Sequence, residues 1–216
     1  SLNAGSLWGR PFYILREAWN ILNAIAEGKI ESGDEKKLNA LKGETMAVIA
    51  LCQFDLTRCF GYPYTKDKGA SLGAPLIDHL VGTYENPPRS TVAQAYDFII
   101  ETLEEAVTLM SEEKNNGRMN KYAARALLAR IYLYHDDNRK AFDLADQLIK
   151  DADTSGSYAL YPHEKYVAAW SVEAKFGSES FFEIANSVDD TPGRDSWGYL
   201  LNWYGYQKGF VTQKYA

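Results

Sequence analysis

The side chains of this 216-residue chain that could act as acids, bases or metal ligands do not form a recognisable catalytic motif. A hydrolase that uses two carboxylates needs them to face each other across a cleft. The adjacent pairs Glu104–Glu105 and Glu112–Glu113 fit solvated helix faces better. The chain also has three histidines at isolated positions without metal-ligand spacing, which are His79, His135 and His163. The sequence therefore favours a binding protein over an enzyme, and we expect no metal and no cofactor.

The reactive side chains between residues 41 and 61 fit structural roles. Cys52 and Cys59 are seven positions apart, which is about 10.5 Å along a helix and beyond the roughly 7 Å that a disulfide tolerates. We expect both to be free, buried thiols. Asp55 and Arg58 are three positions apart, so they can pair with each other on one helix face or with a neighbouring helix.

Composition limits the classes of partner. The chain is 46% hydrophobic and 24% charged, which suits one globular domain with a substantial core. Its formal net charge is −6, whereas binding of nucleic acid requires a clustered basic face. No apolar run approaches the roughly 18 residues that a membrane-spanning helix needs. We therefore expect neither a nucleic-acid partner nor a membrane span.

The stretch from Leu41 to Gly61, LKGETMAVIALCQFDLTRCFG, organises the elements around it. Its apolar residues occupy more than one side of the predicted helix, which indicates packing against neighbours on two sides. Apolar residues at three- and four-residue steps predict four further helices, at residues 10–28, 91–110, 120–134 and 139–150. Thr91 and Gln94 fit a capping box at the start of one of them. The fold is therefore expected to be mostly α.

Two segments refine this prediction. Residues 120–150 read as two helices joined by a tight turn, and their pattern of small and aromatic residues matches a tetratricopeptide repeat. A plain helical bundle is the alternative. Residues 65–89 are long and irregular, and such a segment either packs over the bundle or rims a binding site.

Four segments together resemble one protein family. They are LKGETMAVIALCQFDLTRCFGYPYT, PRSTVAQAYDFIIETLEEA, GRMNKYAARALLARIYLYHDDNRKAFDLADQLI and SESFFEI, the last of which stands where the family has a strand. They come in the family's order and cover residues 10–185. The chain therefore resembles the SusD/RagB family of glycan-binding outer-membrane lipoproteins from Bacteroidetes-type bacteria.

The resemblance implies a tetratricopeptide-like helical-repeat domain at residues 1–185 and a loop-rich aromatic tail at residues 186–216 that begins a further C-terminal region. It also implies a role: capture of oligosaccharide at the cell surface for a SusC-like, TonB-dependent transporter, with membrane attachment only through a lipid anchor that this chain lacks. We expect the chain to be the helical portion of a longer protein or a short member of the family. The alternative is a tetratricopeptide module that binds protein and has no carbohydrate site.

The family implies that sugar is held by aromatic platforms and by polar side chains on loops. Sugar C–H faces stack on aromatic rings, and sugar hydroxyls need hydrogen-bonding partners. In the tail, the candidates are Trp197, Tyr199, Trp203 and Tyr204, with Arg194, Asp195 and Asn202 beside them. Tyr62 and Tyr64 follow the organising helix and are candidates for the rim of a site. The alternative is that these aromatic residues pack against the bundle or against C-terminal sequence that this chain lacks.

Overall fold

The computed structural model describes residues 4–30, 33–114, 117–170 and 175–184. The chain divides into two compact units, Ser1–Glu183 and Ile184–Ala216, and the first contains all but one of the described residues. Its helices are α1 (Ala4–Ala26), α2 (Glu35–Phe60), α3 (Val92–Leu109), α4 (Lys121–Tyr134) and α5 (Asn138–Ser155). Among these described helices, none combines the length and apolar character that a bilayer crossing requires.

The remaining elements of the first unit are short. Two strands, β1 (Leu72–Pro75) and β2 (Arg89–Thr91), pair antiparallel, with Leu72 opposite Thr91 and Pro75 opposite Arg89. Single 3₁₀ turns lie at Tyr64–Lys66, His163–Lys165 and Ala168–Trp170. The segment 178–184, expected to be a strand, forms none. Its Glu183 carboxylate instead accepts hydrogen bonds from the backbone N–H groups of Phe176 and Gly177.

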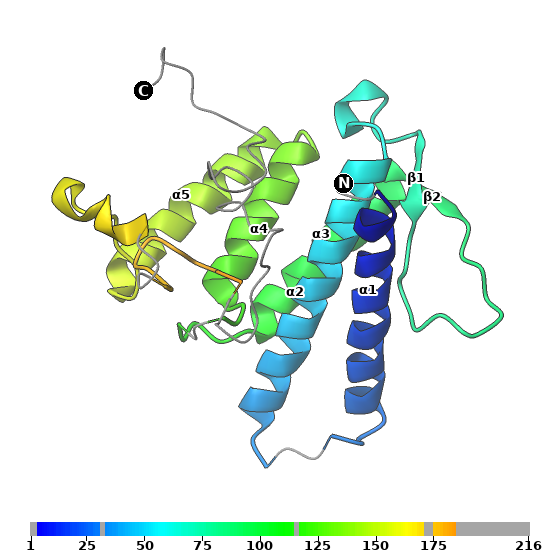
Figure 1. The fold of residues 1–216 in the computed structure, drawn as a ribbon, viewed down its shortest axis with the longest axis horizontal. Coiled ribbons are helices and arrows are strands. Elements are labelled where there is room, and N and C mark those ends of the chain that lie inside the picture. Colours follow the sequence, from blue (N-terminus) through cyan, green and yellow to red (C-terminus); the bar gives the residue numbers. More distant parts are fainter. Residues whose placement is uncertain (1–3, 31–32, 115–116, 171–174, 185–216) are drawn as a thin grey trace, which may run out of the picture. The chain divides into compact units, whose positions relative to one another are not determined.

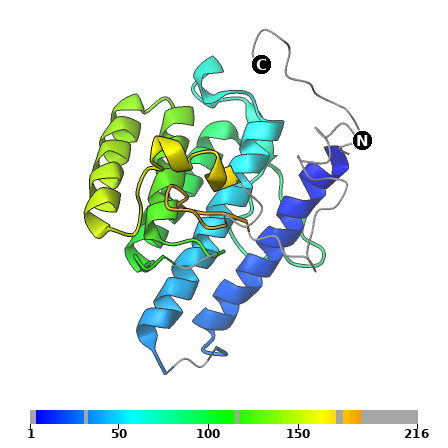
Figure 2. The same cartoon turned by 60° about the vertical axis from the view of Figure 1, so that its left-hand side comes forward.

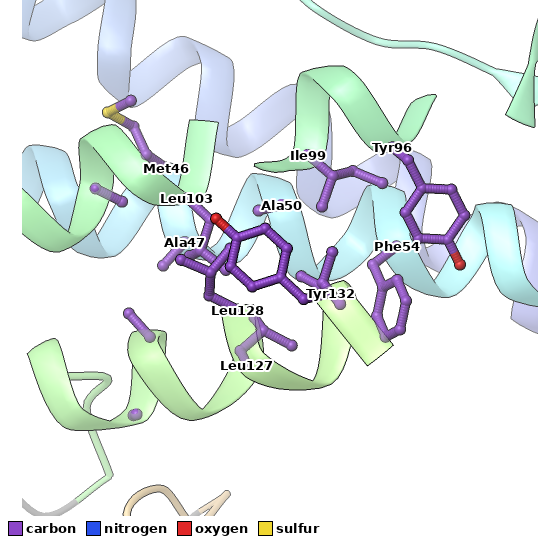
Figure 3. Close-up of a cluster of buried hydrophobic side chains, with 14 of the residues drawn as sticks. Met46, Ala47, Ala50, Phe54, Tyr96, Ile99, Leu103, Leu127, Leu128 and Tyr132 are labelled. Carbon is purple, nitrogen blue, oxygen red and sulfur yellow. The ribbon is translucent and has the colours of Figure 1, made fainter. Parts of the chain in front are cut away.

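Helix α2 packs on two sides, as the sequence predicts. In Figures 1 and 2, α1 and α2 run side by side, and α2 also packs against α3. One face of α2 carries Ile49 and Leu56 into a small cluster with Leu15 of α1 and Ile77. The other face carries Ala47, Ala50 and Phe54 into the larger core with side chains of α3 and α4, which point toward one another in Figure 3.

Both long helices begin earlier than predicted. The side chain of Asp34 accepts hydrogen bonds from the backbone N–H groups of Lys36 and Lys37, and this cap starts α2 before Leu41. Helix α1 extends N-terminal to Pro11, although proline removes a backbone donor. The Trp8 ring packs against the rings of Phe12 and Phe60, at centroid distances of 5.0 and 4.8 Å, and this contact ties the extra turn to the end of α2.

Several local predictions are decided by the structure. The capping box of Thr91 and Gln94 is present at the start of α3. Arg58 donates to Asp55 across 2.7 Å, so the expected pair forms. Both cysteines are free, and burial raises the pKa of the Cys52 thiol to about 12. The expectation that both are buried is wrong for Cys59, which is exposed and lies in the last turn of α2, one residue before the helix ends at Phe60.

Gly28 and Gly69 both have positive φ, so a side chain at either position strains the backbone, but only at Gly69 would a side chain also collide with neighbouring atoms. A Cβ atom at Gly69 would lie 2.6 Å from the backbone nitrogen of Ala93, whereas a Cβ atom at Gly28 would meet nothing within 4 Å. We predict that Gly28→Ala lowers the free energy of unfolding by about 1 kcal/mol, and that Gly69→Ala lowers it by at least about 1 kcal/mol more. Urea denaturation of both variants measures the difference, and equal losses would contradict the close approach.

Candidate functional site

A pocket of about 590 Å³ lies between α1 and the segment that joins β1 to β2. Pockets that bind small molecules typically measure roughly 300–1,000 Å³. One wall comes from α1 and the other from residues 75–87. The lining residues are Trp8, Phe12, Arg16, Pro75, Ile77, Val81, Gly82, Thr83, Asn86 and Pro87.

The α1 wall is built from three side chains at four-residue spacing. Trp8, Phe12 and Arg16 share one helix face because residues four apart are neighbours on an α-helix. The Trp8 side chain is partly exposed, and its contacts with Phe12 and Phe60 are edge-to-face. Arg16 donates from Nε and a terminal nitrogen to one oxygen of Glu17, at 3.1 and 2.9 Å. This wall therefore offers an aromatic surface next to a cation whose charge is locally balanced.

The opposite wall is fixed to the helices by Gln53 and Trp19. The fully buried amide of Gln53 on α2 donates to the carbonyl of Pro75 at 3.1 Å and accepts from the N–H of Ile77 at 3.3 Å. The indole N–H of Trp19 on α1 donates to the carbonyl of Ile77 at 3.1 Å. Three side-chain bonds to the backbone thus fix the segment where it leaves β1, at Pro75 and Ile77, which both line the pocket.

The role of Gln53 leads to a prediction. Gln53→Leu removes both bonds and leaves a part-buried carbonyl at Pro75 and a buried N–H at Ile77 without this partner. An unsatisfied buried polar group costs about 1–3 kcal/mol, and the added apolar burial of leucine offsets part of this. We predict a net loss of about 1–2 kcal/mol in the free energy of unfolding, measured by urea denaturation. A variant as stable as the parent would show that Gln53 does not hold the segment.

The segment that forms the second wall also carries a histidine between two carboxylates, none of which lines the pocket itself. His79 Nδ1 lies 2.6 Å from Asp78 Oδ1, and His79 Nε2 lies 2.7 Å from Glu85 Oε1. These hydrogen bonds, first to Asp78 and then to Glu85, raise the pKa of His79. The N–H of Gly82 donates to the other oxygen of Glu85 at 3.1 Å, and this bond together with His79 lowers the pKa of Glu85.

The side chains that line this pocket suit recognition of a ring that carries hydroxyl groups. An aromatic face from Trp8 can stack on the C–H face of a ring, and the side chains of Arg16, Thr83 and Asn86 can bond hydroxyl groups. Within the described part of the chain, no group of three His, Cys, Asp or Glu side chains is arranged to hold a metal ion.

The sequence-predicted candidates lie elsewhere. Tyr62 is exposed, and the ammonium of Lys66 lies 3.0 Å from its ring centroid. Tyr64 packs at the end of the bundle against His135 and Tyr96, at centroid distances of 4.2 and 5.7 Å. Neither tyrosine lines the pocket, and their binding role stays a prediction. The seven tail candidates lie outside the described residues, namely Arg194, Asp195, Trp197, Tyr199, Asn202, Trp203 and Tyr204.

The pocket residues were not singled out from the sequence as a site. Their available signal was the four-residue spacing of Trp8, Phe12 and Arg16, which places an arginine on a partly aromatic helix face. That signal is shared by many helices that simply pack in a core. No local pattern places residues 81–87 opposite this face, because the segment that carries them is anchored at Pro75 and Ile77 by Gln53 of another helix.

Comparisons with known proteins place this arrangement in a family. A SusD-like family model, described as starch-binding and associating with the outer membrane, matches residues 3–133. A SusD superfamily protein from Bacteroides thetaiotaomicron superposes with a TM-score of 0.81 at 38% identity over 87% of this chain. A putative sugar binding protein from Bacteroides vulgatus superposes with a TM-score of 0.86 at 38% identity over 94% of this chain. No curated protein matches.

These matches confirm the expected mostly helical, tetratricopeptide-type fold. A laminarin binding SusD-like protein also superposes, with a TM-score of 0.67 at 24% identity, over 90% of this chain and 40% of its own length, and shows the same fold. The chain spans only 41% and 46% of the length of the two Bacteroides proteins that are 38% identical to it.

Proposed function

This chain belongs to the SusD-like family, and on that premise we propose that it captures oligosaccharide without catalysing a reaction on it. The family is a carbohydrate-binding one associated with the outer membrane. The observation that carries the proposal for this chain is the pocket beside α1, where Trp8 offers a stacking surface next to Arg16 and Asn86. A relative 38% identical, the Bacteroides vulgatus protein, is described as a putative sugar binding protein, which supports the same role.

The wider role that we propose concerns the whole protein. The whole protein, attached to the membrane by a lipid anchor, holds glycan at the cell surface. It passes this glycan to a SusC-like, TonB-dependent outer-membrane transporter. The family's association with the outer membrane supports this location. We further propose the division of the chain into a helical domain at residues 1–185 and a tail at residues 186–216, whose aromatic residues Trp197 and Trp203 add to the glycan-binding surface.

Titration calorimetry tests the binding role. We expect oligosaccharides of starch or of laminarin to give a saturable heat with the 216-residue chain, and the same sugars to raise its melting temperature because they bind the folded state. A broad panel of plant, host and starch glycans is then tested on the 216-residue chain and on the full-length protein. If neither responds to any glycan, the support for a carbohydrate role is removed.

One observation favours a second function, a protein-binding module without its own sugar site. Helices α4 and α5 expose the large apolar side chains Leu133, Phe142 and Ile149, and a protein partner that covers them would bury their apolar surface. Copurification of an outer-membrane barrel with the protein, combined with no response to any glycan, would favour this function over the first.

A further inference from the structure

A histidine bridge lies within the segment that forms the second wall of the pocket, although its own three residues do not line the pocket. The imidazole of His79 lies within hydrogen-bonding distance of Asp78 on one side and of Glu85 on the other, at 2.6 and 2.7 Å. Glu85 in turn accepts from the N–H of Gly82, and its own N–H donates to the Gly82 carbonyl at 3.1 Å. These bonds connect the beginning and the end of residues 78–85 through side chains.

The bridge lies where it can set the shape of the pocket. The lining residues Val81, Gly82 and Thr83 fall between His79 and Glu85 in the sequence, and Asn86 and Pro87 follow directly. The start of this segment is anchored by the bonds of Gln53 to Pro75 and Ile77, but those anchors end before Asp78. Beyond Ile77, Val81 packs against the small cluster shared by α1 and α2, and the bridge adds a polar side-chain contact that can hold the wall.

We propose that His79 is a positioning residue for the pocket: its imidazolium holds residues 78–87 in the binding shape, and sugar is bound more weakly once His79 loses its proton. A neutral imidazole donates from only one nitrogen, whereas an imidazolium donates from both and can therefore bond both carboxylates. The sugar-binding half of this inference rests on the function proposed above. The shape-holding half concerns the protein alone.

The charges around the bridge define the direction of the pH effect. The pKa of His79 is raised above its ordinary value of 6.5, so the contribution of the bridge is complete below that pH and is lost as the pH rises through the raised pKa. The pKa of Glu85 is lowered below its ordinary value of 4.5, so its contribution is lost only as the pH falls through that lowered pKa. Arg16 of α1 is the charged side chain among the pocket-lining residues and is paired with Glu17, and Gln53 of α2, which holds the start of the segment, is neutral.

The test compares His79→Gln with His163→Gln, a matched control at an exposed histidine of a distant 3₁₀ turn. Nuclear magnetic resonance follows the His79 ring and the amides of Gly82 and Thr83 against pH, and calorimetry follows the affinity for a starch or laminarin oligosaccharide. We expect affinity in the parent and in His163→Gln to fall about two- to fivefold between pH of about 5.5 and about 8.5, as for an exposed ion pair. His79→Gln should show no such dependence.

The two readouts separate the possible failures. Amides of Gly82 and Thr83 that do not follow the titration of His79 would overturn the inference, whether or not sugar binds. An affinity that falls equally with pH in the parent and in His79→Gln would also overturn it while leaving the sugar-binding function intact. If no oligosaccharide binds at any pH, the proposed function and the sugar-binding half fail, and the amide titration alone decides whether His79 holds the wall.

Discussion

Replacing Phe54 by alanine will lower the free energy of unfolding by about 3–5 kcal/mol, the loss typical of a large core residue that is truncated. Phe54 is 1% exposed and lies in the core that joins α2 to α3 and α4 (Figure 3). Its ring packs edge-on against Tyr96 and Tyr134, at centroid distances of 6.2 and 5.3 Å. The truncation therefore removes aromatic contacts and leaves a cavity between three helices. Urea denaturation of the parent and the variant measures the loss.

Phe142→Ala is the matched control for this prediction. It makes the same chemical change at a side chain of α5 that is 64% exposed. We expect a change within about 0.5 kcal/mol there, because surface substitutions rarely exceed this. Equal losses in the two variants would show that Phe54 is not at the centre of the core.

Replacing Trp8 by alanine will weaken oligosaccharide binding at least about tenfold, which corresponds to about 1.4 kcal/mol. The reason is the loss of the aromatic surface in the pocket wall, on which a sugar ring can exclude water over a large area. The variant also loses the packing of Trp8 on Phe12 and Phe60, so its fold is checked by circular dichroism. Calorimetry at one pH near neutrality gives the affinity.

Tyr84→Ala controls for the removal of any aromatic residue near the site. Tyr84 belongs to the same segment as the second wall, is 95% exposed and does not line the pocket. We expect the Tyr84→Ala variant to bind the oligosaccharide with the same affinity as the parent. A tenfold loss in Tyr84→Ala, or an unchanged affinity in a folded Trp8→Ala variant, would mean that sugar is bound at another place.

The helices could be predicted from the sequence because their signals are local. The apolar stripes of 91–110 and 120–134 and the caps at Thr91 and Asn120 depend on residues a few positions apart. The two-sided packing of α2 also followed from its own composition. The N-terminal extension of α1 did not, because it depends on Trp8 meeting Phe60 across two helices.

The candidate site is built from long-range contacts, and for that reason its second wall could not be predicted. Gln53 is a polar residue in an apolar helix, and nothing nearby in the sequence identifies Pro75 and Ile77 as its partners. The family resemblance directed attention to aromatic residues on loops, whereas the pocket takes its aromatic wall from a helix. The candidates in the tail, such as Trp197 and Trp203, stay predictions alongside this pocket.

A crystal structure of the protein grown with an oligosaccharide of starch or laminarin tests the central claim most directly. We predict a sugar ring stacked on the indole of Trp8, with hydroxyl groups directed toward Arg16 or Asn86 and residues 78–87 forming the opposite wall. Sugar bound only at another surface, such as one formed by the tail residues, with the pocket beside α1 empty, would contradict the claim.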